Sequence, residues 1–171
     1  ELLDATAKVI LEGCHPNVRV YSDEIYENII FDGQQHRSIS SVPEMEERTI
    51  IAGGFSKTYA WTGGRIGYAV FPTEKEADIF KTLNINYFSC VPPYNQEAAK
   101  EALENPLSKV AVKEMVETFE ARRNLIWRQI NEIPGITCQK PGGAFYLFPN
   151  ISGVCENHGL IEKHQLLSKE Q

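Results

Sequence analysis

Apolar residues follow two different spacings along this chain. Residues 5–13 carry apolar side chains at helical spacing and stop at Gly13, a residue that commonly ends helices because it accepts a left-handed backbone. Residues 18–21, 49–52 and 66–71 form short β-branched or apolar runs typical of strands. The run at 49–52 has no polar alternation, as expected of a strand covered on both faces. These elements fit an open α/β sheet.

Two later segments carry the start signals of helices. Thr73 and Glu76 have the spacing of a capping box, in which each residue satisfies a free backbone N–H of the other. Asn105-Pro106 predicts another start, because proline at the first helical position loses no hydrogen bond. The second helix should be long and end at Pro134-Gly135, with one apolar face in the core. That face consists of Val112, Met115, Val116, Phe119, Ile126 and Ile130.

Two glycine-containing segments suggest further β structure. Asp32-Gly33 follows an apolar run and predicts the turn of a hairpin. Residues 142–148 begin with two glycines and continue as an apolar and aromatic run, which predicts a strand. We expect a domain boundary near residues 104–107, although the long helix could bridge two domains.

The composition excludes some classes of function. The 171 residues are 42% hydrophobic and 23% charged, which fits one globular domain or a domain plus part of a second. The net charge of −6, from 17 basic and 23 acidic residues, argues against nucleic acid as the main partner. The sequence has neither an apolar run long enough to cross a bilayer nor a signal peptide, so we expect a soluble, cytoplasmic protein. The chain begins without Met and ends in a charged stretch, so we expect both ends to be cut.

Neither the cysteines nor the histidines have the spacing of a metal site. The four cysteines are widely separated, and we expect reduced thiols. We expect the histidines to be surface residues and predict no metal. The residues concerned are Cys14, Cys90, Cys138, Cys155, His15, His36, His158 and His164.

Four residues form the most informative pattern of the chain. Asp23 ends the first predicted strand, and Tyr26 follows three residues later. A Ser56-Lys57 pair follows the second predicted strand, in an expected loop, and Arg65 lies eight residues beyond the lysine. Each of these residues alone would be ordinary, since most loop lysines are simply solvated charges. Together they place an acid, a phenol, an amine and a guanidinium at strand ends and loops, where open α/β sheets keep their ligands.

This combination resembles the fold-type I enzymes that use pyridoxal 5′-phosphate (PLP), and among them the aminotransferases of classes I and II. The resemblance extends through residues 95–99 and 142–150 and covers nearly the whole chain. It implies that residues 1–106 are the C-terminal part of the PLP-binding large domain. Residues 107–171 would then be a linking helix and the truncated beginning of the small C-terminal domain.

The resemblance also implies a role for each residue. Lys57 would hold the cofactor as a Schiff base and, once substrate displaces it, move a proton between the substrate α-carbon and the cofactor. Asp23, expected to be buried, would favour the protonated ring nitrogen. Tyr26 would donate to the phenolic oxygen. Arg65, with Ser56 and nearby backbone N–H groups, would bind the phosphate.

Some features depart from the family's pattern. Gly54 stands where relatives often carry a phosphate-binding Ser, and Gly64 stands where they often carry a Trp. The upstream half of the family, with the residue that stacks on the ring, has no counterpart in these residues. The arginine that clamps the substrate carboxylate is also missing. We therefore expect the 171-residue chain alone to have little or no transaminase activity.

The resemblance favours a transaminase that exchanges an amino group between an amino acid and a 2-oxo acid, as a homodimer. In dimeric relatives, the segment matching residues 87–93 approaches the neighbouring subunit's cofactor. Two alternatives stay open: a PLP lyase or synthase on the same fold, and a non-catalytic PLP-binding domain of a transcription regulator. The identity of the amino acid substrate is not encoded in these residues.

Overall fold

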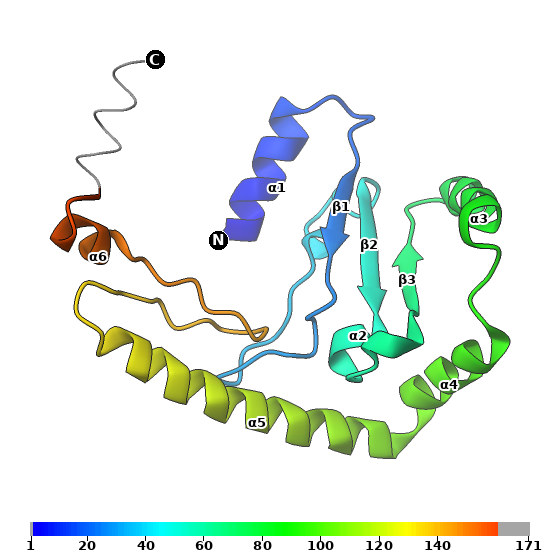
Figure 1. Cartoon of the computed structure of the whole chain (residues 1–171). Helices are drawn as coiled ribbons and strands as arrows, with labels where there is room; N and C mark the ends of the chain where they lie inside the picture. The colour runs from blue at the N-terminus through cyan, green and yellow to red at the C-terminus, as the bar shows by residue number, and fades with distance from the viewer. Residues whose placement is uncertain (1, 161–171) are drawn as a thin grey trace. The chain divides into compact units, whose positions relative to one another are not determined.

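The computed structural model describes residues 2–160, which divide into two compact units (Figure 1). Within this range the first unit contains residues 2–29 and 35–112, and the second contains residues 30–34 and 113–160. We still propose, from the resemblance, that a domain of the natural protein ends at residue 106. His164 and the charged end of the chain lie outside the described residues.

A three-stranded sheet organises the first unit. It is built from β1 (Val20–Asp23), β2 (Thr49–Gly54) and β3 (Gly67–Val70), in the order β1-β2-β3. β1 and β2 are parallel, and β2 and β3 are antiparallel. The three predicted strands are confirmed, each within two residues of the expected bounds. Because β1 and β2 are parallel, their carboxyl ends lie at the same end of the sheet. The candidate site lies at this end.

A small apolar core lies beside β1. Helix α1 (Leu2–Gly13) ends at Gly13 as predicted and contributes the fully buried Ala7. Ala7 packs with Met45 and with Ile39 of the short 3-10 helix η1 (Ile39–Ser41). The segment between β1 and β2 is thereby fixed by its own apolar side chains.

Both predicted helix starts are confirmed. Helix α3 (Glu74–Phe88) is capped by Thr73, whose hydroxyl oxygen accepts from the Glu76 N–H at 3.3 Å. The Glu76 carboxylate accepts instead from Arg19 at 2.5 Å, so only half of the capping box forms. Helix α5 (Pro106–Asn131) begins at the predicted proline. Between them lies α4 (Pro93–Glu104), which the sequence did not predict.

The apolar face of α5 is less buried than its spacing predicted. Its predicted core residues are half-buried, and Ile126 is 43% exposed. The buried side chain of this helix is instead a charged one, Arg123, with 4% of its surface exposed. Arg123 is therefore the buried tertiary contact of the helix, beside apolar contacts such as that of the half-buried Phe119 with Phe145.

The predicted strand at residues 142–148 is wrong. Only isolated bridges form, Ile30 with Gly143 and Thr137 with Asn150, before the short helix α6 (Ser152–Asn157). Ala144 has a left-handed backbone with φ of 57°, which interrupts an extended strand. The aromatic side chains of the run, which suggested burial in a sheet, include Phe148 at 97% exposure.

The turn at Asp32-Gly33 forms, but the predicted hairpin does not. Both residues have positive φ, 58° and 68°, and the Gln34 N–H closes the turn on the Phe31 carbonyl at 3.1 Å. The side chain of Asp32 accepts two hydrogen bonds from Arg123, at 2.8 and 2.9 Å, and one from Lys140 at 3.0 Å. The turn therefore serves as an ion-pair partner of α5 and not as the end of a hairpin.

This ion pair should make the stability of the protein sensitive to acid. The hydrogen bonds from Arg123, with those from Lys140, lower the pKa of Asp32 from 3.8 to about 2. A carboxyl group with a lowered pKa stabilises the fold above its unfolded pKa and loses that contribution as the pH falls through its folded pKa. We expect the melting temperature to fall between about pH 4 and pH 2, with a shallower fall in Asp32→Asn. Equal slopes in both proteins would contradict this assignment.

Several other features of the described residues bear on the expectations. No helix within residues 2–160 has the length and apolar character needed to cross a bilayer. The same range contains no cluster of three or more histidine, cysteine or acidic side chains suited to a metal ion. All four cysteines are free thiols.

Candidate functional site

The predicted site residues of β1 and β2 lie at the same end of the sheet. Asp23 is the last residue of β1, as predicted, and pairs with Ala52 of β2. Lys57 follows β2, not in a loop but in the one-turn helix α2 (Phe55–Thr58), visible at the end of β2 in Figure 1. The helix forms because the buried Phe55 ring packs on Tyr59, with centroids 5.2 Å apart, and on Trp61.

Lys57 and Tyr26 are distant in the sequence but lie close together in the folded chain. The ammonium of Lys57 lies 5.8 Å from the centroid of the Tyr26 ring, within the range of a cation–π contact. Both residues are half-buried. The amine and the phenol predicted to contact one cofactor are therefore neighbours in the folded chain.

Asp23 is held by its own turn. Its Oδ1 accepts from the Ile25 N–H at 3.3 Å, and the next residue, Glu24, extends the β ladder by donating its N–H to the Ala52 carbonyl at 2.8 Å. In the described chain Asp23 is exposed, in contrast to the expected buried carboxylate. The reason is its place in the sheet: β1 is an edge strand, and Asp23 lies on the more exposed of its two faces.

Ser56 and Arg65 belong to the same compact turn. The Thr62 hydroxyl donates to the Ser56 carbonyl at 3.1 Å, and Arg65 Nη1 donates to the Thr62 carbonyl at 2.9 Å. Arg65 follows the 3-10 helix η2 (Thr62–Gly64) in a left-handed conformation, with φ of 50°. Its side chain is exposed. The turn therefore keeps both predicted phosphate ligands on one segment after β2.

The structure explains the two departures from the family's pattern. A Cβ atom at Gly64 would lie 2.4 Å from the indole of Trp61, so a side chain there requires this indole to shift. A Cβ atom at Gly54 would lie 3.1 Å from Ile25 Cδ1 and 3.3 Å from the backbone of β3, which is tight but adjustable. A tryptophan thus fills the space beside Arg65, but it comes from position 61.

We expect Gly64→Ala to lower the free energy of unfolding by about 1–3 kcal/mol, because the new methyl group must displace the Trp61 ring. Gly63→Ala is the matched control, since a Cβ atom there meets nothing within 4 Å. Urea unfolding of the two variants measures the difference. Equal stabilities would show that Trp61 moves aside at no cost.

Several polar contacts around these residues were not predicted from the sequence. Glu24 is 8% exposed and binds His36 and Ser38. The Tyr68 hydroxyl donates to Glu27 at 3.1 Å, and burial, with the nearby Glu27 charge, raises the pKa of Tyr68 to about 12. Alternation along β1 did not indicate Glu24, because the expected burial of Asp23 would have placed the next side chain on the outward face.

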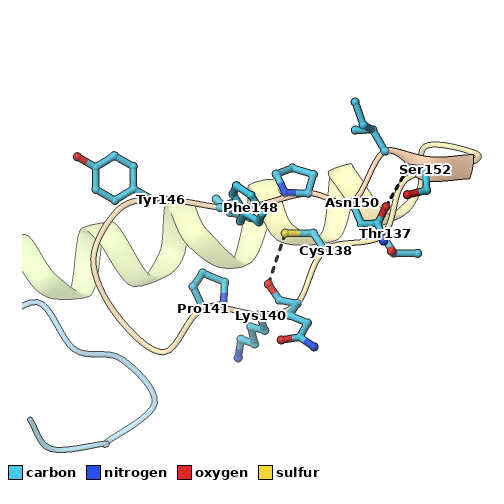
Figure 2. A pocket seen from close by; sticks show the side chains of 12 residues that line it. Thr137, Cys138, Lys140, Pro141, Tyr146, Phe148, Asn150 and Ser152 are labelled. Atoms are coloured by element: carbon cyan, nitrogen blue, oxygen red, sulfur yellow. Dashed lines mark hydrogen bonds between the residues drawn. The ribbon is translucent and has the colours of Figure 1, made fainter. Parts of the chain in front are cut away.

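A cavity of about 1060 Å³ lies in the second unit, and no predicted site residue lines it (Figure 2). Figure 2 shows Tyr146 and Phe148 on one stretch of its wall and Cys138 and Lys140 on the other. A second cavity, of about 690 Å³, lies in the first unit between β3, α3 and α4. Neither is lined by Asp23, Tyr26 or Lys57, so volume alone does not locate the site.

Comparison with known proteins identifies the family of the chain. The model of the family "Aminotransferase class I and II" matches residues 5–170. The chain belongs to this family. The family depends on PLP, and the α/β fold is that of fold type I, as the sequence predicted.

Individual aminotransferases resemble the chain over most of its length. It is 40% identical to aromatic-amino-acid aminotransferase 2 of Thermococcus litoralis over 90% of this chain, and 43% identical to the aspartate aminotransferase of Pyrococcus abyssi over 77%. The aromatic aminotransferase of Pyrococcus horikoshii superposes with a TM-score of 0.79 at 38% identity, over 86% of this chain and 38% of that structure. The chain spans 39% and 33% of the length of the first two relatives.

Proposed function

We propose that this chain supplies the cofactor-holding residues of a PLP-dependent aminotransferase, which moves an amino group between an amino acid and a 2-oxo acid. The observation that carries the proposal is the position of Lys57. It lies directly after β2, beside the Tyr26 ring and at the strand ends where Asp23 is found.

The side chains present fit the chemical groups of PLP. Lys57 offers the amine for the aldehyde, Tyr26 a donor for the phenolic oxygen, and Asp23 a carboxylate for the ring nitrogen. Arg65 offers a planar fork for the phosphate, and Ser56 a hydroxyl. When bound, PLP supplies an electron sink for the carbanion at the substrate α-carbon. The exposure of Asp23 and Arg65 leaves both charged groups accessible to such a ligand.

Lys57 has the further task of moving a proton. An amine released beside the α-carbon can accept a proton from that carbon and return it to a neighbouring carbon of the cofactor, as base and then acid. Tyr26 lies close enough to orient the Lys57 ammonium through its ring face. The two residues would therefore act as one unit in the proton transfer.

The names of the relatives suggest aspartate and aromatic amino acids as the first substrates to test. We further propose a homodimer. Residues 87–93 begin at the exposed aromatic residues Tyr87 and Phe88, which are 79% and 76% exposed and offer apolar area to a second copy. We also propose a cytoplasmic location, as expected from the sequence.

Borohydride reduction of the PLP-treated full natural chain, followed by peptide mapping, tests the cofactor assignment. We expect the pyridoxyl group on Lys57. A label on another lysine, or on none, would refute the proposed role of Lys57. Product analysis with a 2-oxo acid acceptor then separates a transaminase from a lyase, which eliminates a leaving group and needs no acceptor.

A further inference from the structure

A buried carboxylate lies immediately after the proposed ring-nitrogen ligand. Glu24 is 8% exposed, and both of its oxygens are occupied. Oε1 accepts from the Ser38 hydroxyl at 2.5 Å, and Oε2 lies 2.7 Å from His36 Nε2. An ionised carboxylate is acceptor-only, so His36 Nε2 must carry a proton toward it. We call Glu24, His36 and Ser38 the Glu24 cluster.

The cluster keeps Glu24 ionised in the folded chain. Burial raises the pKa of Glu24, but hydrogen bonds from Ser38, His36 and Ser22 outweigh this effect and lower the pKa overall. Ser38 is itself fixed, because it caps η1 by accepting from the Ser40 N–H at 3.2 Å. A buried charge is costly unless it is fully bonded, so the cluster holds one defined geometry.

The geometry of the cluster bears directly on Asp23. Glu24 directly follows β1 and is buried, whereas Asp23 is exposed, so the two side chains continue the alternation of the strand and lie on opposite faces. The Glu24 N–H also continues the ladder onto Ala52 of β2, the strand that leads to Lys57. Movement of the Glu24 side chain would therefore turn the end of β1 and carry Asp23 with it.

We propose that the Glu24 cluster is a positioning device that aims Asp23 at the ring nitrogen of PLP. This inference rests on the proposed function. Glu24 and His36 would not contact the cofactor. They would affect the protonation of the ring nitrogen through the position of Asp23.

The test uses the full natural chain loaded with PLP that carries ¹⁵N in the ring. The ¹⁵N chemical shift of the protein-bound cofactor reports ring protonation, and it is read only from samples whose circular dichroism shows folded protein and from which free PLP has been removed. His36→Leu removes the hydrogen bond to Glu24, whereas His36→Gln keeps an N–H donor. Glu24→Gln removes the charge.

We expect His36→Leu and Glu24→Gln to shift the ring ¹⁵N signal toward the unprotonated form and to weaken PLP binding about tenfold, the size of one lost charge-assisted hydrogen bond. His36→Gln should stay close to the unmodified protein. Should Glu24→Gln fail to fold, the pair of His36 variants still decides, since His36 lies at the surface.

Unchanged shifts in His36→Leu, or equal shifts in both His36 variants, would overturn the inference while the proposed function stands. The two failures are distinguishable through Lys57. If borohydride does not label Lys57 in the unmodified protein, the proposed function fails, and this inference falls with it. If Lys57 is labelled and the ring ¹⁵N shift is unchanged by substitutions in the Glu24 cluster, only the inference fails.

Discussion

Lys57→Ala is expected to lower transamination by the full natural chain at least about 10³-fold, because one substitution removes both the covalent anchor and the proton carrier. Borohydride should then leave no pyridoxyl group on the segment around position 57. Steady-state rates with aspartate or an aromatic amino acid, and a 2-oxo acid acceptor, measure the loss.

Two control variants separate this effect from a loss of charge. Lys8→Ala removes a lysine whose side chain is 71% exposed on α1, and it should leave the rate unchanged. Lys57→Arg keeps the positive charge beside Tyr26 but cannot form the imine, so it should be as inactive as Lys57→Ala. Full activity in either Lys57 variant would mean that another residue holds the cofactor.

Arg123→Ala is expected to lower the free energy of unfolding by about 2–4 kcal/mol, the largest stability effect that the structure predicts. Arg123 donates to both oxygens of Asp32 and to the Pro141 carbonyl, and its guanidinium lies 4.7 Å from the centroid of the Phe31 ring. Truncation removes this packing and leaves the Pro141 carbonyl without its donor.

The neighbouring residue provides a matched control for this variant. Arg122 is exposed on the same turn of α5, so Arg122→Ala should change stability by less than about 0.5 kcal/mol. Equilibrium unfolding in urea, with both variants at neutral pH, measures the difference. Similar losses in the two variants would show that the loss does not come from the ion pair with Asp32, since alanine itself favours a helix.

The sequence predicted the elements whose signals are local. Capping by Thr73 and the proline start of α5 depend on a few adjacent residues, and both are confirmed. Residues 142–148 misled the prediction, because an apolar run indicates a strand only if another strand pairs with it. In the described chain they form one isolated bridge, between Gly143 and Ile30.

In the candidate site, too, the sequence predicted the residue types but not the contacts between distant residues. The residue types at positions 23, 26, 57 and 65 indicated the family, because they suit the chemical groups of PLP and their spacing resembles that of the family. The contact of His36 with Glu24 joins residues twelve positions apart around an irregular segment, and no periodicity predicts it. His36 was therefore predicted only as a surface residue, which its exposure confirms but its hydrogen bond makes incomplete.

The membership of residues 30–34 in the second unit limits how the protein can be dissected. The chain crosses between the units three times, after residues 29, 34 and 112, although a gene cut at the last crossing would appear to separate them cleanly. A fragment starting at residue 113 would lack Asp32 and would carry Arg123 with its principal counter-ion deleted. An expression plan for the second unit therefore has to supply the 30–34 turn, as a fused or co-expressed peptide.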